Sequence, residues 1–159
     1  MEAGFLGRLE QFPNSFERYI VFLPNETQIP LRAETQVIKH FWDAANSTDD
    51  SVLFSGIAKG DGLIEAREKF NITEKSEPYF ILLDKCPSEW NSMVDPIVKI
   101  PVGQFDNEDD VTHLLLSLVT AVSIREVKRK EFFRKAKNVL ANLPYGDLIS
   151  LIIPISQGG

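Results

Sequence analysis

Tyr19-Ile-Val-Phe-Leu23 is an uninterrupted apolar run rich in β-formers, and Pro24-Asn25 ends it. A run of this kind predicts a strand that is buried on both faces. Residues 30–45 follow and predict an amphipathic helix. Its expected apolar stripe consists of Leu31, Glu34, Ile38, Phe41 and Ala45. Ser51-Val-Leu-Phe-Ser55 predicts a second strand, which is expected to lie parallel to the first through a right-handed crossover.

The middle of the chain predicts a second helix and two more strands. Residues 63–70 have the pattern of a short helix, and Tyr79-Phe-Ile-Leu-Leu83 predicts a third strand. Residues 96–102 predict a fourth strand, which we expect at a sheet edge because prolines flank and interrupt it. Since no helix separates the last two strands, they are expected to form an antiparallel hairpin.

Two further stretches, residues 1–16 and the chain from Val111 to about Leu143, are expected to be helical. Residues 1–16 have roughly helical spacing of their apolar residues, which Pro13 ends. At the other end, nothing breaks a helix between Val111 and about Leu143, so a kink or break is expected near Ser123 because such a helix would be unusually long.

These elements predict an α/β fold with three layers, in which helices cover both faces of a four-stranded mixed sheet of order 2-1-3-4. The chain divides into three expected parts. They are an N-terminal helical segment (1–16), the main domain (17–124), and a C-terminal extension with a basic helix and an aliphatic tail (125–159).

Part of the main domain resembles the thioredoxin-like family. The resemblance is carried by Val52-Leu-Phe54, by Glu65-Ala-Arg-Glu-Lys-Phe-Asn-Ile72 and by Glu77-Pro-Tyr-Phe-Ile-Leu-Leu83. In thioredoxins, a helix that ends in Lys-Tyr/Phe-x-Ile leads to a cis-proline at the third strand, and Lys69-Phe-Asn-Ile72 and Pro78 match that phrase and spacing. The resemblance covers about residues 17–124 and implies a thioredoxin-like three-layer sandwich. If the bond before Pro78 is cis, the resemblance implies backbone that holds an extended peptide; the alternative is a structural proline at a strand start.

The chain departs from the family at the reactive position. Thioredoxins carry paired cysteines at the helix start after their first strand, where the helix dipole and free N–H groups lower the thiol pKa. The equivalent stretch here, Pro24-Asn-Glu-Thr-Gln-Ile-Pro30, contains no cysteine. The one cysteine, Cys86, follows the third strand, far from that position in the expected fold. Dithiol exchange is therefore excluded, and single-cysteine peroxidase activity is not expected.

Composition limits the other function classes. The 159 residues are 43% hydrophobic, which suits a single globular domain, and the net charge of −6 argues against nucleic-acid binding by the chain as a whole. No run approaches the ~20 apolar residues of a membrane span, and no secretory signal is recognised, so a cytoplasmic location is expected. His40 and His113 have no spaced second ligand, and Gly56–Gly62 fits no phosphate-loop pattern. The sequence predicts no metal, no cofactor and no catalytic residue.

The most unusual segment is residues 125–137, which hold seven bases and two acids, a net charge of +5. The bases are Arg125, Lys128, Arg129, Lys130, Arg134, Lys135 and Lys137. One interpretation is a solvated helix stabilised by the i,i+4 pairs Glu126–Lys130 and Glu131–Lys135. The other is a docking helix for an acidic protein, for a second copy, or for a nucleic acid.

The tail beyond Pro144 is rich in aliphatic side chains, among them Leu148, Ile149 and Ile152. Since burial of each such side chain is worth ~1.5–3 kcal/mol, they are not expected to remain in water. Three placements are open: an extra strand of the sheet, packing under the basic helix, or contact with another subunit.

The leading hypothesis is a non-catalytic thioredoxin-like interaction or scaffold module that forms a homodimer through its C-terminal extension. One alternative is an enzyme or small-ligand binder that uses the Asn25–Gln28 helix start and the Pro78 loop without thiol chemistry. The other is a nucleic-acid binder that uses residues 125–137. The candidate contact residues are the seven bases, the three tail residues named above and Pro78.

Overall fold

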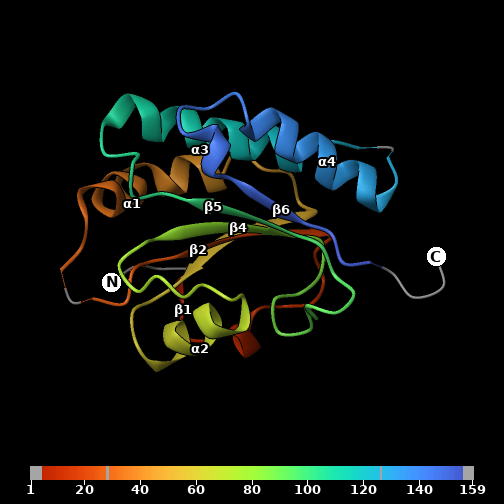
Figure 1. Ribbon diagram of the computed structural model, residues 1–159, viewed down its shortest axis with the longest axis horizontal. Helices are drawn as coiled ribbons and strands as arrows, with labels where there is room; N and C mark the ends of the chain where they lie inside the picture. Colours follow the sequence, from red (N-terminus) through yellow and green to blue (C-terminus); the bar gives the residue numbers. More distant parts are fainter. Residues whose placement is uncertain (1–4, 28, 126, 156–159) are drawn as a thin grey trace.

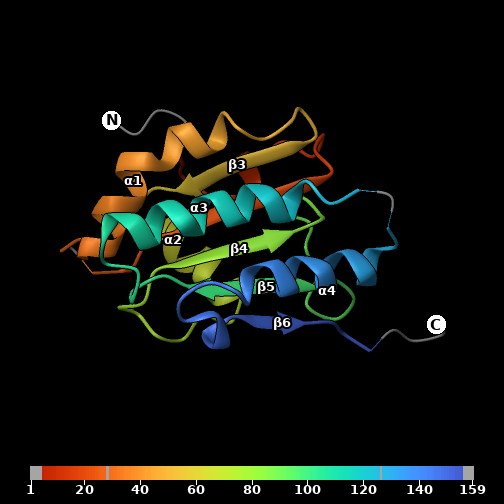
Figure 2. The same ribbon diagram turned by 90° about the horizontal axis from the view of Figure 1, so that it is seen from above.

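The computed structural model describes residues 5–27, 29–125 and 127–155, and its centre is a mixed six-stranded sheet (Figures 1 and 2). The strands are β1 (Phe5–Leu6), β2 (Arg18–Leu23), β3 (Val52–Ile57), β4 (Tyr79–Leu83), β5 (Ile97–Pro101) and β6 (Ser150–Ile152). Their order across the sheet is β1-β3-β2-β4-β5-β6. The helices are α1 (Arg32–Ala45), α2 (Asp61–Lys69), α3 (Glu108–Val122) and α4 (Arg129–Leu140), with short 3-10 turns at Leu9–Gln11 and Gly146–Leu148.

The four central strands confirm the predicted order. β2 pairs in parallel with β3 and antiparallel with β4, and β4 pairs antiparallel with β5. Residues Tyr19 to Leu23 of β2 are completely buried, as expected for a strand covered on both faces. The sheet nevertheless has six strands, because one short strand is added at each edge.

Helices cover both faces of the sheet. α1, α3 and α4 lie on one face, and α2 lies on the other together with the segments around Leu9 and Trp90 (Figure 1). Each face has its own apolar core, in which alternate residues of the same strands take part: Ile20 and Phe22 of β2 face α1 and α3, whereas Tyr19 and Val21 face α2. None of the helices in the described ranges has the length and apolar character needed to cross a membrane.

Within residues 5–16, the predicted N-terminal helix is not found, and the segment contains a short strand and one 3-10 turn at Leu9–Gln11. Phe5 and Leu6 form β1, which pairs in parallel with Gly56 and Ile57 at the end of β3. A Cβ atom on Gly56 would lie 2.9 Å from the Phe5 ring, so the missing side chain lets the ring lie against the strand. A Cβ on Gly62 would lie 1.8 Å from the Gly7 carbonyl oxygen, so this segment also packs tightly on α2.

The prediction that the fourth strand lies at a sheet edge was also wrong. The tail returns to the sheet as β6, which pairs antiparallel with Ile97–Lys99 of β5. Pro101 is compatible with this position because it lies beyond the paired residues, where no N–H is needed by β6. Of the three placements open for the tail, the structure therefore contains the extra strand.

The helices differ from prediction in detail. The expected break near Ser123 is confirmed, because α3 ends at Val122 and α4 begins at Arg129. The buried face of α1 is rotated from the predicted stripe: Ala33, Glu34, Val37, Phe41 and Ala44 are buried, whereas Ile38 and Trp42 of α1 are each 40% exposed. The Phe5 ring of β1 packs edge-on against Phe41 and Trp42, a partner that the sequence did not reveal.

Candidate functional site

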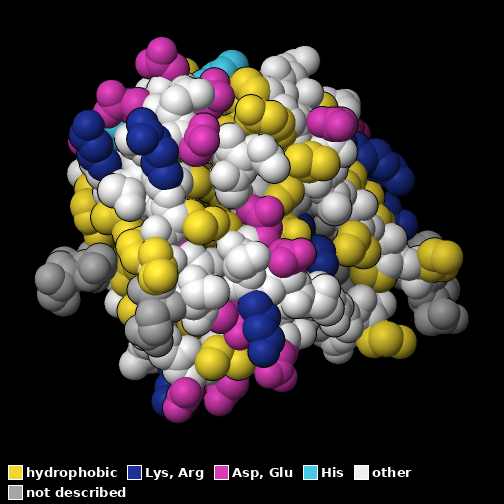
Figure 3. Space-filling view, turned by 60° about the vertical axis from the view of Figure 1, so that its left-hand side comes forward, with side chains coloured by type: hydrophobic (Ala, Val, Ile, Leu, Met, Phe, Trp, Pro, Cys, Tyr) yellow, Lys and Arg dark blue, Asp and Glu magenta, His cyan; other side chains and the backbone are white. Residues whose placement is uncertain are grey.

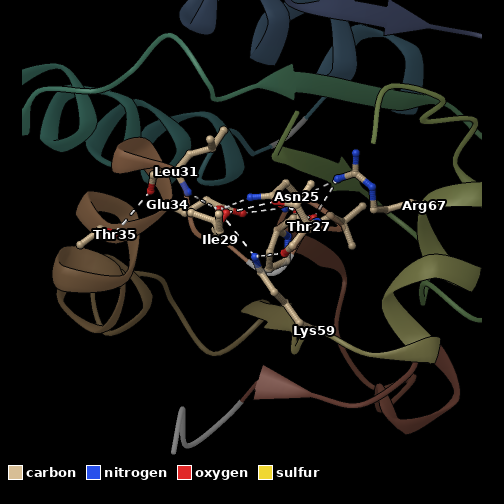
Figure 4. A network of polar contacts seen from close by, with 10 residues as sticks. Asn25, Thr27, Ile29, Leu31, Glu34, Thr35, Lys59 and Arg67 are labelled. Atoms are coloured by element: carbon tan, nitrogen blue, oxygen red, sulfur yellow. Dashed lines mark hydrogen bonds and ion pairs between the residues drawn. The ribbon is translucent and has the colours of Figure 1, made fainter. Parts of the chain in front are cut away.

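A buried polar network lies where β2 ends and α1 begins (Figure 4). The Glu34 carboxylate accepts hydrogen bonds from the backbone N–H of Asn25 (2.6 Å), from the Asn25 side-chain amide, and from the backbone N–H of Leu31 (2.8 Å). The last bond caps α1, because a glutamate in the first turn reaches back to the residue before the helix. Asn25 and Glu34 are at most 1% exposed, so the network fixes the path of the chain from strand to helix.

Lys59, which follows β3, joins this network from the neighbouring strand. Its ammonium donates to the Thr27 carbonyl oxygen (2.7 Å) and lies 3.9 Å from Glu34 Oε1. Thr27 in turn donates its N–H to the Asn25 side-chain oxygen (2.7 Å), an Asx turn that shapes the loop. The Lys59 side chain is 34% exposed, so it is the one charged group of this cluster that both contacts the buried network and reaches the surface.

Arg67 of α2 closes the other side of the loop. Its guanidinium is fully buried, donates to the Pro24 carbonyl oxygen (2.9 Å) and to the Glu74 carbonyl oxygen (2.5 Å), and pairs with Glu26 (3.2 Å). Burial lowers the pKa of Arg67, and the charge of Glu26 opposes that shift. The buried charge is therefore compensated by one ion pair and by backbone oxygens, which ties α2 to the end of β2.

The position of the network follows from the topology. After β2 the chain passes to α1 on one face, and after β3 it passes to α2 on the other, which leaves a crevice between the carboxyl ends of the two parallel strands. A pocket of about 380 Å³ lies there, with Glu34 and Lys59 on an otherwise apolar wall. The apolar lining residues are Phe5, Pro24, Pro30, Ile38 and Ala58. Figure 3 brings this end of the molecule forward and shows apolar side chains gathered in patches among charged ones.

The pocket beside Lys59 could hold a small molecule, but no cysteine lines it, so thiol chemistry does not take place there. Every hydrogen bond of Glu34 is used to hold the loop, so the lysine and the apolar wall are the groups that a bound molecule would meet. Cys86 is buried at the opposite end of the sheet, because Leu83 at the end of β4 pairs with Tyr19 at the start of β2. Its Sγ lies 3.4 Å from the Phe12 carbonyl oxygen.

Pro78 lies at the same end of the sheet as Asn25, at the start of β4. The residue is buried, its carbonyl oxygen accepts from the Val102 N–H (2.9 Å), and the peptide bond before it is trans, as are the other bonds in the described part of the chain. Its backbone oxygen is therefore engaged in the hairpin. Gln28, the end of the predicted Asn25–Gln28 loop, lies outside the described residues.

Three of the seven predicted bases form ion pairs within the molecule. Arg125 pairs with Asp49 (2.5 Å), and Lys135 pairs with Glu131 (3.1 Å), as predicted for that helical pair. Arg129 makes a bidentate contact with Asp84 (2.5 and 2.7 Å) and also donates to the buried Asp95 (2.7 Å). Glu126, the predicted partner of Lys130, lies outside the described residues.

The remaining four bases have no ion pair within the described ranges; they are Lys128, Lys130, Arg134 and Lys137. The hydrogen bonds that Arg129 donates to Asp84 and Asp95 raise its pKa. Arg129 therefore links α4 to the loop after β4. The other four bases have no such partner in the described ranges and could contact another molecule.

Of the three predicted contact residues in the tail, one is buried and two are exposed. Ile149 is 5% exposed and belongs to the core under α4, whereas Leu148 and Ile152 are 47% and 45% exposed. Among the described residues, no three His, Cys, Asp or Glu side chains converge as metal ligands would. His40 contacts Glu108 (2.7 Å), and His113 is exposed on α3.

Sequence reasoning named Asn25 but missed Glu34, Lys59 and Arg67. The signal for Glu34 was present, because an acid on a predicted apolar stripe, three residues after a helix start, is typical of a capping carboxylate. Arg67 had no such signal, since its burial depends on the loop that folds over it. No family model, no curated protein and no solved structure matches this chain.

Proposed function

We propose that the chain is a non-catalytic interaction module of thioredoxin-like architecture that binds other proteins through its C-terminal extension. The architecture is supported by the succession β3-β2-β4-β5, by the antiparallel β4–β5 hairpin and by helices on both faces. The absence of catalysis by thiols is supported by the sequence, whose single cysteine is buried at the end of the sheet away from Asn25. A module of this kind suits the cytoplasm, because it needs no disulfide.

The observation that carries the proposal is the position of β6. Among the residues that the structure describes, it is the last strand of the sheet and pairs with β5 alone, so its other side is an open edge within those residues. Open edges pair readily with extended segments of other chains. Beside this edge the extension leaves Leu148, Ile152 and Ile155 exposed, the last by 88%.

Self-association takes a specific form in this proposal. Because Ile149 is buried within the molecule and Leu151 packs on the same core, the apolar surface left on the tail is confined to Leu148, Ile152 and Ile155 beside the edge. Two copies would therefore meet edge to edge, with one β6 against the other, and the sheet would continue through the dimer.

Sedimentation velocity tests whether the edge is competent to pair. We expect weak, concentration-dependent dimerisation at about 1 M NaCl, where repulsion between like-charged copies is screened. Ile152→Lys should abolish it, because a charge on an edge strand opposes edge-to-edge pairing. Ile64→Lys is the matched control, since Ile64 is 40% exposed on α2 and distant from β6. Equal dimerisation by Ile152→Lys would count against the edge as a docking surface, and failure to dimerise at any salt would remove self-association from the proposal.

The pocket beside Lys59 favours a second candidate function, the binding of a small ligand with an apolar body and an anionic end. Pockets of this size with few polar groups on an apolar wall are typical of ligand sites. A panel of small aliphatic and aromatic carboxylates, titrated by NMR, should shift the amides of Thr27 and Lys59, and Lys59→Met should abolish the shifts. Unchanged amides across the panel would remove this candidate.

A further inference from the structure

The outer edge of β6 is flanked by a stripe of bases on α4. Lys130, Arg134 and Lys137 recur at i, i+4 and i+7, so they lie on one side of the helix. None of them forms an ion pair in the described part of the chain. We call these three residues the basic stripe.

The basic stripe faces away from α3 and toward β6. On the opposite side of α4, two residues after Lys130, the Phe132 ring lies 3.6 Å from the guanidinium carbon of Arg18 in β2. Since β2 lies on the α3 side of α4, the stripe must lie on the other side, above the outer margin of the sheet. Figure 2 shows this margin, where β6 extends beyond α4.

The two faces of β6 differ in character at this margin. Leu151 packs on the core beneath α4, so it points to the helical face of the sheet. Ile152 alternates with it and points to the other face, where it is 45% exposed. A strand added to β6 would therefore meet the basic stripe on one face and an apolar side chain on the other.

A second copy fits this edge poorly. In an antiparallel pair of β6 strands that continues the sheet, both helical layers lie on the same face, and the two basic stripes would confront each other across the junction. Like charges brought together at an interface repel each other most strongly at low salt, which disfavours this pairing under those conditions. The same stripe would stabilise a strand that carries acids.

We infer that β6 takes up an extended acidic segment of another protein by strand addition, an inference that rests on the proposed function of this edge. Lys130 and Lys137 are seven positions apart in the helix, or about 10 Å at ~1.5 Å per residue. Acids at alternate positions of a strand lie ~6.8 Å apart on one face, so two or three of them match that length. The preferred segment therefore alternates acidic residues, which face the stripe, with apolar residues, which face Ile152.

Fluorescence anisotropy with short peptides tests the inference. The probe is a labelled peptide with the core Glu-Val-Glu-Val-Glu between Gly-Ser ends. One control peptide has Lys in place of each Glu, and another has Pro in place of each Val, which keeps the charge but prevents strand pairing. We expect only the Glu-Val peptide to bind, and its affinity to fall about tenfold or more between about 0.05 M and about 0.5 M NaCl.

Paired charge reversals locate the contact. Lys130→Glu with Arg134→Glu should weaken binding at least about tenfold. Lys128→Glu with Lys135→Glu is the matched control, with the same change of charge but away from the β6 side, and should weaken binding no more than about threefold. Thermal melts of both variants check that each remains folded.

The outcomes separate this inference from the function on which it rests. Equal binding of the Lys peptide, equal binding of the Pro peptide, or tighter binding of single-stranded DNA than of the Glu-Val peptide would overturn strand addition by an acidic segment. If no peptide binds but the protein dimerises at high salt through β6, the edge remains a docking surface and the acidic partner is wrong. If neither occurs, both are wrong.

Discussion

Replacing Glu34 by alanine should destabilise the protein strongly, because the carboxylate holds the strand-to-helix connection together. The change removes the acceptor for two N–H donors of Asn25, which is fully buried, and for the N–H of Leu31, which is only partly buried and can bond to water. A buried donor left without a partner costs about 1–3 kcal/mol. Two such donors therefore predict a loss of about 2–6 kcal/mol, a large part of the ~5–15 kcal/mol that stabilises a typical domain.

Urea unfolding followed by circular dichroism measures this loss. Glu34→Gln keeps one carbonyl oxygen in place, so its free energy of unfolding should lie between those of the alanine variant and the wild type. Glu65→Ala is the control, because Glu65 is exposed on α2, and its effect should stay within about 0.5 kcal/mol. A Glu34→Ala variant as stable as this control would refute the role given to the network.

Three further variants test other contacts of the structure. Arg129→Ala leaves Asp95, which is 1% exposed, without its closest cation, so the free energy of unfolding should fall by about 1–3 kcal/mol. An unchanged free energy of unfolding would show that this ion pair does not stabilise the fold. Gly62→Ala places a Cβ atom 1.8 Å from the Gly7 carbonyl oxygen, so the melting temperature should fall and the amides of β1 should exchange faster; an unshifted melting curve would contradict this close packing. Hydrogen bonds from two basic side chains of α1 lower the pKa of Glu108, so its stabilising effect is present above the ordinary pKa of about 4.3 and is lost as the pH falls through the lowered value. Urea titrations from pH ~6 to ~3 should therefore bring wild type and Glu108→Gln to equal stability at the acid end, and a constant difference would contradict the assignment.

The central strands were predictable because each contains a short apolar run, unbroken in β2 and β4 and interrupted by Lys99 in β5, which is typical of strands that are largely buried on both faces. The two edge strands were not, for opposite reasons. β1 has only two residues and depends on Gly56, a partner about fifty positions away whose missing side chain admits Phe5. β6 contains enough apolar residues to be noticed, but the sequence left its placement open, since the same residues could have covered a second copy.

The candidate surfaces were predictable only in part. The excess of bases in residues 125–137 was visible in the sequence. Which of them form ion pairs depends on Asp49, Asp84 and Asp95, which approach from distant loops. Helical spacing alone would have grouped Lys130, Arg134 and Lys137. The direction in which that stripe points could not be predicted, because it requires the contact between Arg18 and Phe132.

Amide hydrogen exchange of Ser150, Leu151 and Ile152, measured by NMR with and without the Glu-Val peptide, tests the central claim most directly. If β6 is the docking edge, those of its amides that point away from β5 exchange rapidly in the free protein and become protected when the peptide binds. Exchange at β6 that stays unchanged at saturating peptide would contradict the claim.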